Sequence, residues 1–521
     1  MPTSTIAVGG RSAKRGETTP ERLFPWQNIL VGIAALALFG LGLWMRLRDL
    51  GLPFDRDSYD EGVYWQSLRA MSGGYHLYQQ IFYSQPPFFL VSVFPTYMLF
   101  GQTIWAARLG VALISLLGLL GAFLLGKAVS GRLGALAALL LLIVDPLYLM
   151  QSQTLQAEAP YVAFSFLSVG LAYLWWKRPD GIPGLCYATL SGATLSLSIL
   201  CKLLGVAALV PVGLLLLAHI WRIFQQEQDT KKRLVAVRAP LVGILAFLVV
   251  AAAILLPFVG SLHQMIQGVV TFHTEAGRIF RNTRRDNLSQ IQNELTTLLA
   301  LAALYGTLVA LLRRNWLVLP LIAWFLTTIV LLWQQVPLFH HHFVALTPPL
   351  ISLAVMGIGP VQPLKRLVPS LYTITTVVAV LVILLVMVAD GVKAQQYYRG
   401  ELAKSIDISV VKWDVNVERD LQSVTRPDQL VVTDAQFLTA LAKRSTPPQL
   451  VDTSGVRADT GYLTAQQLIA EASQSQVHAV LFSTGRLLRI KNIDIFYAWL
   501  TKHFRRMYNY YSGKELWVRV S

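Results

Sequence analysis

Long apolar stretches recur along most of the chain and stop near residue 390. Each is roughly 17–25 residues long, the length of a helix that crosses a hydrocarbon core about 30 Å thick. The pattern predicts about eleven spans, at 27–46, 103–127, 132–150, 159–176, 183–200, 203–221, 239–259, 294–312, 316–333, 343–359 and 369–390. The predicted fold class is therefore a polytopic α-helical membrane protein, with its transmembrane domain over residues 26–390.

Basic residues in short loops predict the orientation of these spans. With the N-terminus in the cytoplasm, the loops on that side contain Lys127 and Arg132, Lys177 and Arg178, the basic run 222–238, Arg313 and Arg314, and Lys365 and Arg366. This agrees with the excess of Lys and Arg that cytoplasmic loops carry. Segments 47–102 and 260–293 and the C-terminal part then lie outside, and the expected location is the plasma membrane.

The apolar segment Pro86–Gly101 decides on which side of the membrane the later loops lie, because counting it as a span would move every later basic loop outside. Its three prolines also disfavour a straight spanning helix. We therefore expect a juxtamembrane helix that lies along the outer interface.

Both ends of the chain lack the long apolar pattern. Residues 1–25 are rich in Ser, Thr, Gly, Arg and Lys and predict a disordered cytoplasmic tail. In the region 391–521, strand patterns at 430–433, 449–452 and 478–483 alternate with helical patterns at 435–443, 464–473 and 494–505. Such alternation predicts a small soluble α/β domain outside the membrane.

Composition supports the membrane class and limits the partners. Hydrophobic residues make up 54% of the 521 positions and charged residues only 14%, with a mean hydropathy of +0.52. The net charge of +16 follows from the basic loops, so we expect the lipid bilayer and no nucleic acid as a partner. Cys186 and Cys201, at either end of one apolar span, indicate neither a disulfide framework nor a metal site.

An acidic cluster, residues 55–61, follows the first span. Carboxylates beside a bilayer either solvate a loop or take part in proton chemistry. Asp60 and Glu61 open a segment with apolar residues at helical spacing, which would hold them at the start of a short interfacial helix. We expect both to be catalytic and Asp57 to contact substrate.

Two further groups stand at the predicted outer ends of spans. Glu158 precedes an apolar span, where a carboxylate is costly without a partner, and is a third catalytic candidate; the alternative is a carboxylate at the lipid interface. Lys202 lies in the short break between two outer span ends, within reach of the same mouth.

The outward loop 260–293 breaks the charge pattern. It holds four arginines, which suit the oxygens of a phosphate, although a solvated basic face is the alternative. These arginines are Arg278, Arg281, Arg284 and Arg285. Together with Lys202 they form the predicted site for the phosphate of a substrate, the donor phosphate site.

Three consecutive histidines, His340 to His342, precede a late span. Adjacent helical residues point about 100° apart, so a single-site metal triad is not expected. We expect His341 and His342 to contact a sugar or phosphate, with an ordinary interfacial role as the alternative. We predict no metal site, and a divalent cation shared between carboxylates and phosphate stays open because no spacing demands one.

Acids, a lysine and a guanidinium cluster at one rim of a helical bundle suit sugar transfer from a lipid phosphate. An acid deprotonates the acceptor hydroxyl while cations stabilise the phosphate that leaves. Anchoring the donor in the bilayer also fixes its depth.

At this point the chain resembles a known family. The motifs are Tyr59-Asp60-Glu61, Pro86-Pro87, Phe100-Gly101, Ala106-Ala107-Arg108-Leu109, Glu158, Leu200-Cys201-Lys202 and His341–Pro349. They are similar to those of the protein O-mannosyltransferases and the lipid A aminoarabinose transferases, which are polytopic GT-C glycosyltransferases. The likeness covers residues 50–390. Gln85 departs from the pattern, because many relatives have Lys before the Pro-Pro pair.

The resemblance implies an inverting transfer of a sugar from a polyprenyl-phosphate donor to a protein, lipid or glycan acceptor at the outer face. By position, Asp60 would be the catalytic acid/base and Glu61 its companion, while Lys202 and loop arginines would hold the donor phosphate.

Two other classes compete with the enzyme. A transporter or flippase of lipid-linked sugars would place charges at mid-depth of its spans, whereas here the acids gather at one rim. A scaffold that only displays the C-terminal domain would not need such dense chemistry in its outer loops.

Overall fold

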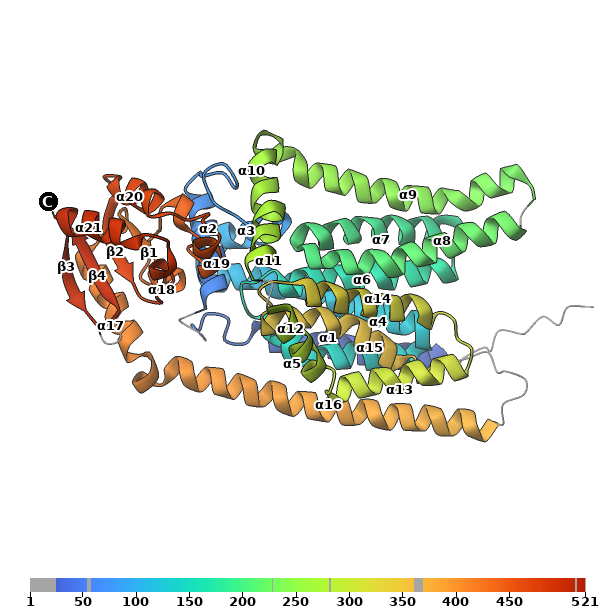
Figure 1. Ribbon diagram of the computed structural model, residues 1–521. Helices are drawn as coiled ribbons and strands as arrows, with labels where there is room; N and C mark the ends of the chain where they lie inside the picture. The colour runs from blue at the N-terminus through green and yellow to red at the C-terminus, as the bar shows by residue number, and fades with distance from the viewer. Residues whose placement is uncertain are drawn as a thin grey trace, which may run out of the picture.

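The computed structural model describes residues 25–53, 58–226, 228–280, 283–359, 369–510 and 513–520. The predicted tail therefore lies outside the described residues except for Pro25, and so do Asp57 and Arg281. The molecule consists of an elongated helical bundle with a small α/β domain at one end (Figure 1). We call this end of the bundle the domain end.

Most bundle helices run along the long axis of the molecule (Figure 1). They are α1 (Pro25–Leu47), α4 (Ile104–Val144), α5 (Pro146–Ser152), α6 (Glu158–Lys177), α7 (Gly181–Cys201), α8 (Leu209–Gln226), α9 (Thr230–Leu255), α13 (Leu298–Leu312), α14 (Val318–Gln334), α15 (Thr347–Val355) and α16 (Pro369–Ile406).

Shorter elements cover the domain end. They are α2 (Tyr59–Ser72), α3 (Phe88–Leu99), η1 (Leu203–Ala208), η2 (Leu256–Ser261), α10 (Leu262–Ile266), η3 (Gln267–Thr271), α11 (Phe272–Ile279), α12 (Thr283–Glu294) and η4 (His340–Leu346). At 12 residues, α3 is too short to cross a membrane, in agreement with the expected juxtamembrane helix.

The membrane class is confirmed, but the count of about eleven spans is not. Within the described residues, seven helices are long and apolar enough to cross a membrane, or eight if the bent pair Arg284–Glu294 and Leu298–Leu312 is one span. Part of the difference lies in α4. Its 41 residues contain a break at Ser130 and Gly131, and a Cβ on Gly126 would lie 2.3 Å from the carbonyl oxygen of Gly134. Residues eight apart in a continuous helix would be about 12 Å apart, so the chain folds back there as two predicted spans require.

The predicted boundary at 391 falls inside α16, which ends at Ile406. The C-terminal domain begins after it, with α17 (Ile408–Val424). It continues with β1 (Leu430–Thr433), α18 (Gln436–Leu441), η5 (Pro448–Leu450), α19 (Gly455–Asp459), α20 (Ala465–Ser473), β2 (Val477–Phe482), η6 (Leu487–Arg489), α21 (Ile493–His503), β3 (Phe504–Asn509) and β4 (Glu515–Arg519). The sheet order is β1-β2-β4-β3, with β1 and β2 parallel and the other pairs antiparallel.

The strand expected at 449–452 is wrong. Pro447 and Pro448 provide no N–H groups for a sheet, and a 3₁₀ turn forms instead. The two missed strands, β3 and β4, form an edge hairpin in which the side chains of β3 are mostly exposed. Such a strand lacks the apolar alternation that the prediction used.

Helix α2 lies between the bundle and the C-terminal domain and contacts both. Toward the domain, a Cβ on Gly62 would lie 2.3 Å from the backbone nitrogen of Phe437, so only glycine permits this approach. The Gln66 side chain donates hydrogen bonds to the carbonyls of Gln436 and Arg444 and accepts one from the backbone N–H of Thr446. The interface is therefore packed and hydrogen-bonded.

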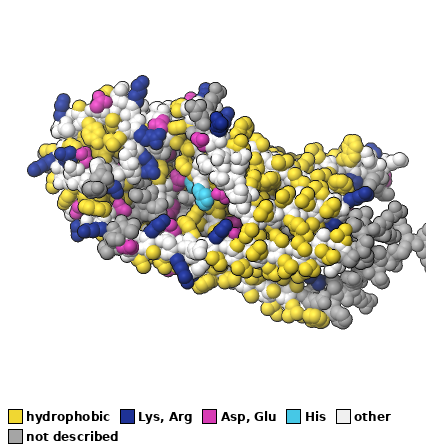
Figure 2. Space-filling model, turned by 60° about the horizontal axis from the view of Figure 1, so that its bottom comes forward, with side chains coloured by type: hydrophobic (Ala, Val, Ile, Leu, Met, Phe, Trp, Pro, Cys, Tyr) yellow, Lys and Arg dark blue, Asp and Glu magenta, His cyan; other side chains and the backbone are white. Residues whose placement is uncertain are grey.

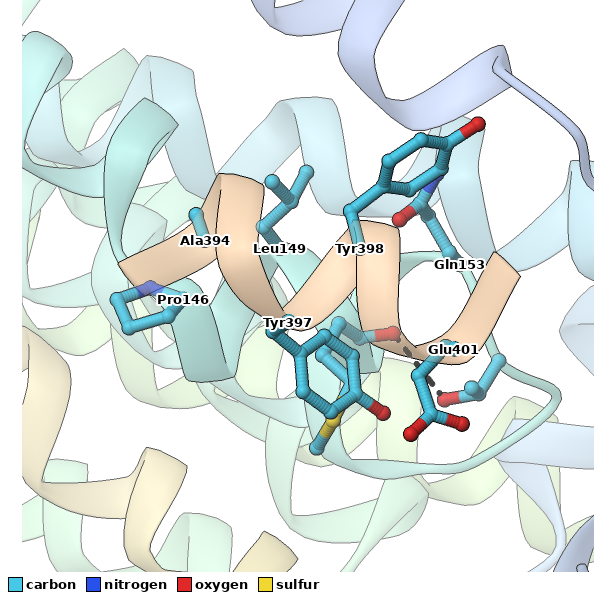
Figure 3. A pocket seen from close by; sticks show the side chains of 9 residues that line it. Pro146, Leu149, Gln153, Ala394, Tyr397, Tyr398 and Glu401 are labelled. Carbon is cyan, nitrogen blue, oxygen red and sulfur yellow. Dashed lines mark hydrogen bonds between the residues drawn. The ribbon is translucent and has the colours of Figure 1, made fainter. Parts of the chain in front are cut away.

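Helix α16 joins the membrane part to the domain and is held against α5 on its way. Pro146, Leu149 and Tyr397 line a cleft of about 30 Å³ between them, enough for one water molecule (Figure 3). Nearby, the Tyr398 hydroxyl donates to Asp49, and the Arg48 guanidinium lies 3.3 Å from the centre of the Tyr398 ring. These contacts fix the exit of α16 from the bundle.

Candidate active site

A cavity of about 580 Å³ lies between the domain end of the bundle and the C-terminal domain. Acidic and histidine side chains are visible where the apolar bundle meets the charged domain (Figure 2). The cavity wall gathers residues from α2, the loop before α3, the start of α6, the end of α7, α11, η4 and the C-terminal domain. We call this space the central cavity.

Asp60 lines the central cavity from the first turn of α2. Its side chain is 42% exposed, and its Oδ2 lies 3.8 Å from Nε2 of His341. The cavity walls around Asp60 displace much of its solvent and thereby raise its pKa although the side chain is partly exposed; His341 and Lys202 oppose this shift and the Glu158 carboxylate adds to it. A carboxylate that reaches open space with a raised pKa is suited to accept a proton.

Glu158 and Lys202 form a buried ion pair in the wall of the same cavity. Glu158 occupies the first turn of α6, where the helix dipole stabilises a negative charge. Lys202 follows the last residue of α7, where the extended backbone breaks the helix before η1. The sequence placed Lys202 and Glu158 separately at the outer ends of spans, and the structure joins them as an ion pair.

Two histidines of η4 complete this group. Nε2 of His341 lies 3.5 Å from Oε1 of Glu158, and Nε2 of His342 lies 4.0 Å from it. The backbone N–H of Phe339 donates to Nδ1 of His342, so this nitrogen carries no proton. Burial, followed by the charges of Lys202, His341 and His273, lowers the pKa of His342 well below its usual value. His342 is therefore a neutral group.

These same side chains can approach a metal ion together. The ligand atoms of Glu158, His341 and His342 all lie within 4.8 Å of one another, a set of types that suits zinc. The nearer oxygen of Glu158 already accepts from Lys202, whose charge would repel a cation. The expectation of no metal site stays a prediction.

Glu61 does not line the central cavity, although the sequence suggested a catalytic role. Its side chain is 2% exposed and receives two hydrogen bonds from Arg108, of 2.8 and 2.6 Å. The backbone N–H of Leu155 donates a third, of 2.5 Å. Consecutive residues of a helix point about 100° apart, so Asp60 and Glu61 face different surroundings. The geometry corrects the expectation: Glu61 anchors α2 to α4.

The loop arginines do not reach the central cavity in the described residues. Arg278 is exposed near the end of α11, and Arg284 and Arg285 lie on α12; none of them lines the cavity, while Phe272, His273 and Phe280 of the same region do. The helical turns of α11 direct its aromatic side inward and its basic side outward. The expected arginine site for a phosphate is therefore not supported for these three. Arg281 lies outside the described residues.

A smaller cavity of about 130 Å³ adjoins the central cavity at Lys202. Gln85, His273, Gln335 and Val336 line both cavities with it. The remaining walls combine Leu203 and Leu204 with the Gln334 amide. Lys202 thus faces a space that has polar and apolar sides.

Several cavity residues were not among the predicted site residues. Asp452, Arg486 and Arg489 reach the cavity from the C-terminal domain, and Tyr59 lies beside Asp60. The Tyr59 hydroxyl donates a hydrogen bond of 2.9 Å to Oδ1 of Asp452, across 393 residues of sequence. The polar run Asp452-Thr453-Ser454 directly after the apolar Leu450-Val451 is the sequence signal that could have pointed to this contact.

Comparisons with known proteins agree with the fold. The profile of the family described as "Dolichyl-phosphate-mannose-protein mannosyltransferase" matches residues 75–274, a range that includes Glu158 and Lys202. No curated protein matches the sequence of this chain.

Two solved structures are similar over most of the chain. ArnT from Cupriavidus metallidurans bound to undecaprenyl phosphate matches with a TM-score of 0.57 and 16% identity, over 96% of this chain and 99% of ArnT. The oligosaccharyltransferase of Archaeoglobus fulgidus in the apo form matches with a TM-score of 0.50 and 15% identity, over 95% of this chain and 74% of that one. These matches confirm the predicted fold: the chain has the fold of GT-C glycosyltransferases, and its residues 75–274 are similar to the protein mannosyltransferase profile.

Proposed function

We propose that this protein is an inverting glycosyltransferase that moves a hexosyl or pentosyl unit from a polyprenyl monophosphate to an acceptor hydroxyl, at the outer face of the plasma membrane. The observation that carries the proposal is the central cavity, which combines a partly exposed acid, Asp60, with a buried Lys202–Glu158 pair. ArnT, with a similar fold, was solved bound to undecaprenyl phosphate. The basic residues Lys177 and Arg178 at the opposite end of α6 support the outer placement of the cavity.

In this proposal Asp60 accepts the proton of the acceptor hydroxyl. The acceptor oxygen then forms a bond with the anomeric carbon of the donor sugar, and the bond from that carbon to the phosphate oxygen breaks. The electron pair leaves with the polyprenyl phosphate. Nε2 of His341 lies between the two acids, 3.8 Å from Asp60 and 3.5 Å from Glu158, and stabilises their negative charges electrostatically.

Lys202 stabilises the phosphate as it gains charge in the smaller cavity, whose Gln85 and His273 add polar contacts. Glu158 holds the lysine in place until the phosphate arrives. The apolar Leu203 and Leu204 next to Lys202 suit the start of a polyprenyl chain.

The test is transfer by Asp60→Asn protein in vesicles supplied with a panel of radiolabelled polyprenyl-phosphate sugars. Losing a general base lowers the rate by a factor of about 100 to 10,000, and we expect a loss in this range. Asp428→Asn, which removes an exposed carboxylate in the C-terminal domain, is the matched control and should retain full activity. Normal transfer by folded Asp60→Asn protein would remove Asp60 from the mechanism.

The same vesicles separate an enzyme from a flippase. Without any acceptor, an enzyme of this class leaves the labelled lipid in its original leaflet. Movement of the intact lipid between leaflets in proportion to protein content would instead indicate transport.

A further inference from the structure

The outer wall of the central cavity belongs to the C-terminal domain, and its Arg486 stands on a rigid loop. Buried Asp434 accepts hydrogen bonds from the backbone N–H groups of Ser483, Thr484 and Leu487. Gly485, with φ of 76°, makes the turn in this loop. The position of Arg486 is therefore fixed before any ligand binds.

Arg486 differs from its basic neighbours in its partners. Arg489 is paired with Asp459, and Arg457 donates to the backbone carbonyls of Gln449 and Asp452. Arg486 lies over the ring of Tyr59, 4.1 Å from its centre, and no described carboxylate or carbonyl accepts its N–H groups. A half-buried guanidinium with open donors is a binding site for an anion or a strongly polar group.

The nearby Asp452 carboxylate does not neutralise the Arg486 guanidinium by forming an ion pair with it in the part of the chain that the structure describes. Asp452 is 7% exposed, and its Oδ1 accepts from the Tyr59 hydroxyl and from the backbone N–H of Ser454. It forms no salt bridge with Arg486 within the described residues. Its role is to hold the Tyr59 ring against which the guanidinium stacks.

Arg486 stacks on the residue directly before Asp60. An acceptor hydroxyl that gives its proton to Asp60 places its neighbouring groups next to this wall, whereas the donor phosphate binds at Lys202 on the bundle side. The donors of Arg486 form a planar fork that matches the two oxygens of a carboxylate or phosphate.

We propose that Arg486 and Tyr59 form an acceptor subsite for an acidic saccharide, one that carries a carboxylate or a phosphate close to the accepting hydroxyl. The proposal rests on the proposed function in one respect, the role of Asp60 as the base. Tyr59 supplies an apolar face for the sugar ring, and Arg486 binds the anionic group.

The first experiment measures binding, so it does not depend on catalysis. The purified full-length protein in detergent is mixed with methyl glucuronide, glucose 6-phosphate or neutral methyl glucoside, and saturation-transfer NMR reports the bound sugar. We expect the acidic probes to bind about tenfold more tightly than the neutral one, the size of one charge-assisted hydrogen bond. Arg486→Gln should abolish this preference and Arg486→Lys should retain part of it.

The matched control is Arg505→Gln, which removes an exposed guanidinium from β3 and should leave the preference unchanged. The glucuronide and phosphate arms distinguish the two sources of negative charge. Equal binding of acidic and neutral probes to the wild type, or an undiminished preference in folded Arg486→Gln protein, would overturn the proposal.

The second experiment separates this inference from the proposed function. Slow hydrolysis of a labelled polyprenyl-phosphate sugar reports the Asp60 and Lys202 machinery without an acceptor. We expect Arg486→Gln to keep this hydrolysis and to lose about tenfold in kcat/KM for transfer to the acidic probe. If no donor is cleaved but acidic sugars still depend on Arg486 for binding, the proposed function fails and the subsite stands.

Discussion

At the scale of single residues, the neighbours Asp60 and Glu61 show how a rotation of about 100° between consecutive helix positions separates two roles. Asp60 faces the central cavity and has a raised pKa, whereas the Glu61 carboxylate accepts hydrogen bonds from Arg108 and from the backbone N–H of Leu155. The sequence identified both as acids in a suitable place. It could not tell them apart, because the partner of Glu61 lies 47 residues away and the helix rotation that points each side chain depends on packing.

The pH dependence of transfer should report Asp60. Its pKa lies above the ordinary value of 3.8, so the base takes up a proton at a higher pH than a solvent-exposed aspartate. We therefore expect kcat/KM to rise with pH through this raised pKa and to fall toward zero below it. Rates measured across the acid range check this, and the residual activity of Asp60→Asn should lack the inflection.

His342 should make the fold sensitive to acid. In the unfolded chain the pKa of the His342 imidazole is about 6.5. In the folded protein its pKa lies well below that value. At a pH between the two pKa values the unfolded state binds more protons than the folded state. The contribution of His342 to the unfolding free energy is therefore complete above pH 6.5 and decreases as the pH falls below it. We expect the Tm in detergent to decrease between about pH 7 and pH 5.

His342→Asn is the informative variant for that prediction. Its amide oxygen can accept the hydrogen bond that Phe339 donates, but it cannot titrate. A shallower decrease of Tm in acid is expected, and an unchanged slope would assign the acid sensitivity to other groups.

Lys202 offers a prediction of stability rather than chemistry. Replacing it by Met leaves the Glu158 carboxylate buried without its partner, which costs about 3–5 kcal/mol of unfolding free energy. Lys202→Met together with Glu158→Gln removes both charges and should recover most of the loss. Chemical unfolding of both variants measures the difference, and equal losses would show that the pair is not coupled.

At the scale of elements, α2 is the point where the two parts of the molecule meet. Arg108 and Leu155 hold it to the bundle, while Gln66 and Tyr59 bind it to the C-terminal domain. The amphipathic pattern of residues 61–71 was enough to predict a helix. Its double attachment was not predictable, since it uses polar contacts to residues more than 300 positions away.

Gly62→Ala should disturb this attachment selectively. The new methyl group would lie 2.3 Å from the backbone nitrogen of Phe437, which cannot move as a flexible side chain does. We expect a destabilisation of about 1–3 kcal/mol, with a larger fall in transfer than in bilayer insertion. Gly213→Ala in α8 is the control, because nothing lies within 4 Å of its Cβ position and the helix gains slightly. Equal stability of the two variants would contradict the close packing.

At the scale of the whole molecule, the C-terminal domain completes the site. The apolar core of the bundle continues into Phe437, Ala440 and Val451 of that domain, and Asp452 and Arg486 form part of the cavity wall. The sequence predicted the membrane class, the GT-C resemblance and an α/β domain, because these rest on long repeating patterns. It predicted one rim for Asp60, Glu158, Lys202 and the histidines through the orientation of the loops. It could not predict which domain residues meet them.

A protein cut before α17 should therefore lose transfer altogether, and not only the choice of acceptor. The cut exposes Trp65 and Gln66 of α2 and removes the outer wall next to Asp60. Comparing donor hydrolysis by full-length and truncated protein in the same membranes checks this. Sustained hydrolysis by a folded truncated protein would show that the bundle alone positions Asp60.

The single helix α16 also has a consequence for reach. Its 38 residues measure about 57 Å, roughly 27 Å more than a hydrocarbon core about 30 Å thick, so the helix continues past the length of one span, along α5, before it joins the domain. A helix of fixed length would set the height of the C-terminal domain above the lipid headgroups. We expect a domain held at a fixed height to admit thin acceptors between itself and the membrane and to exclude bulky folded ones.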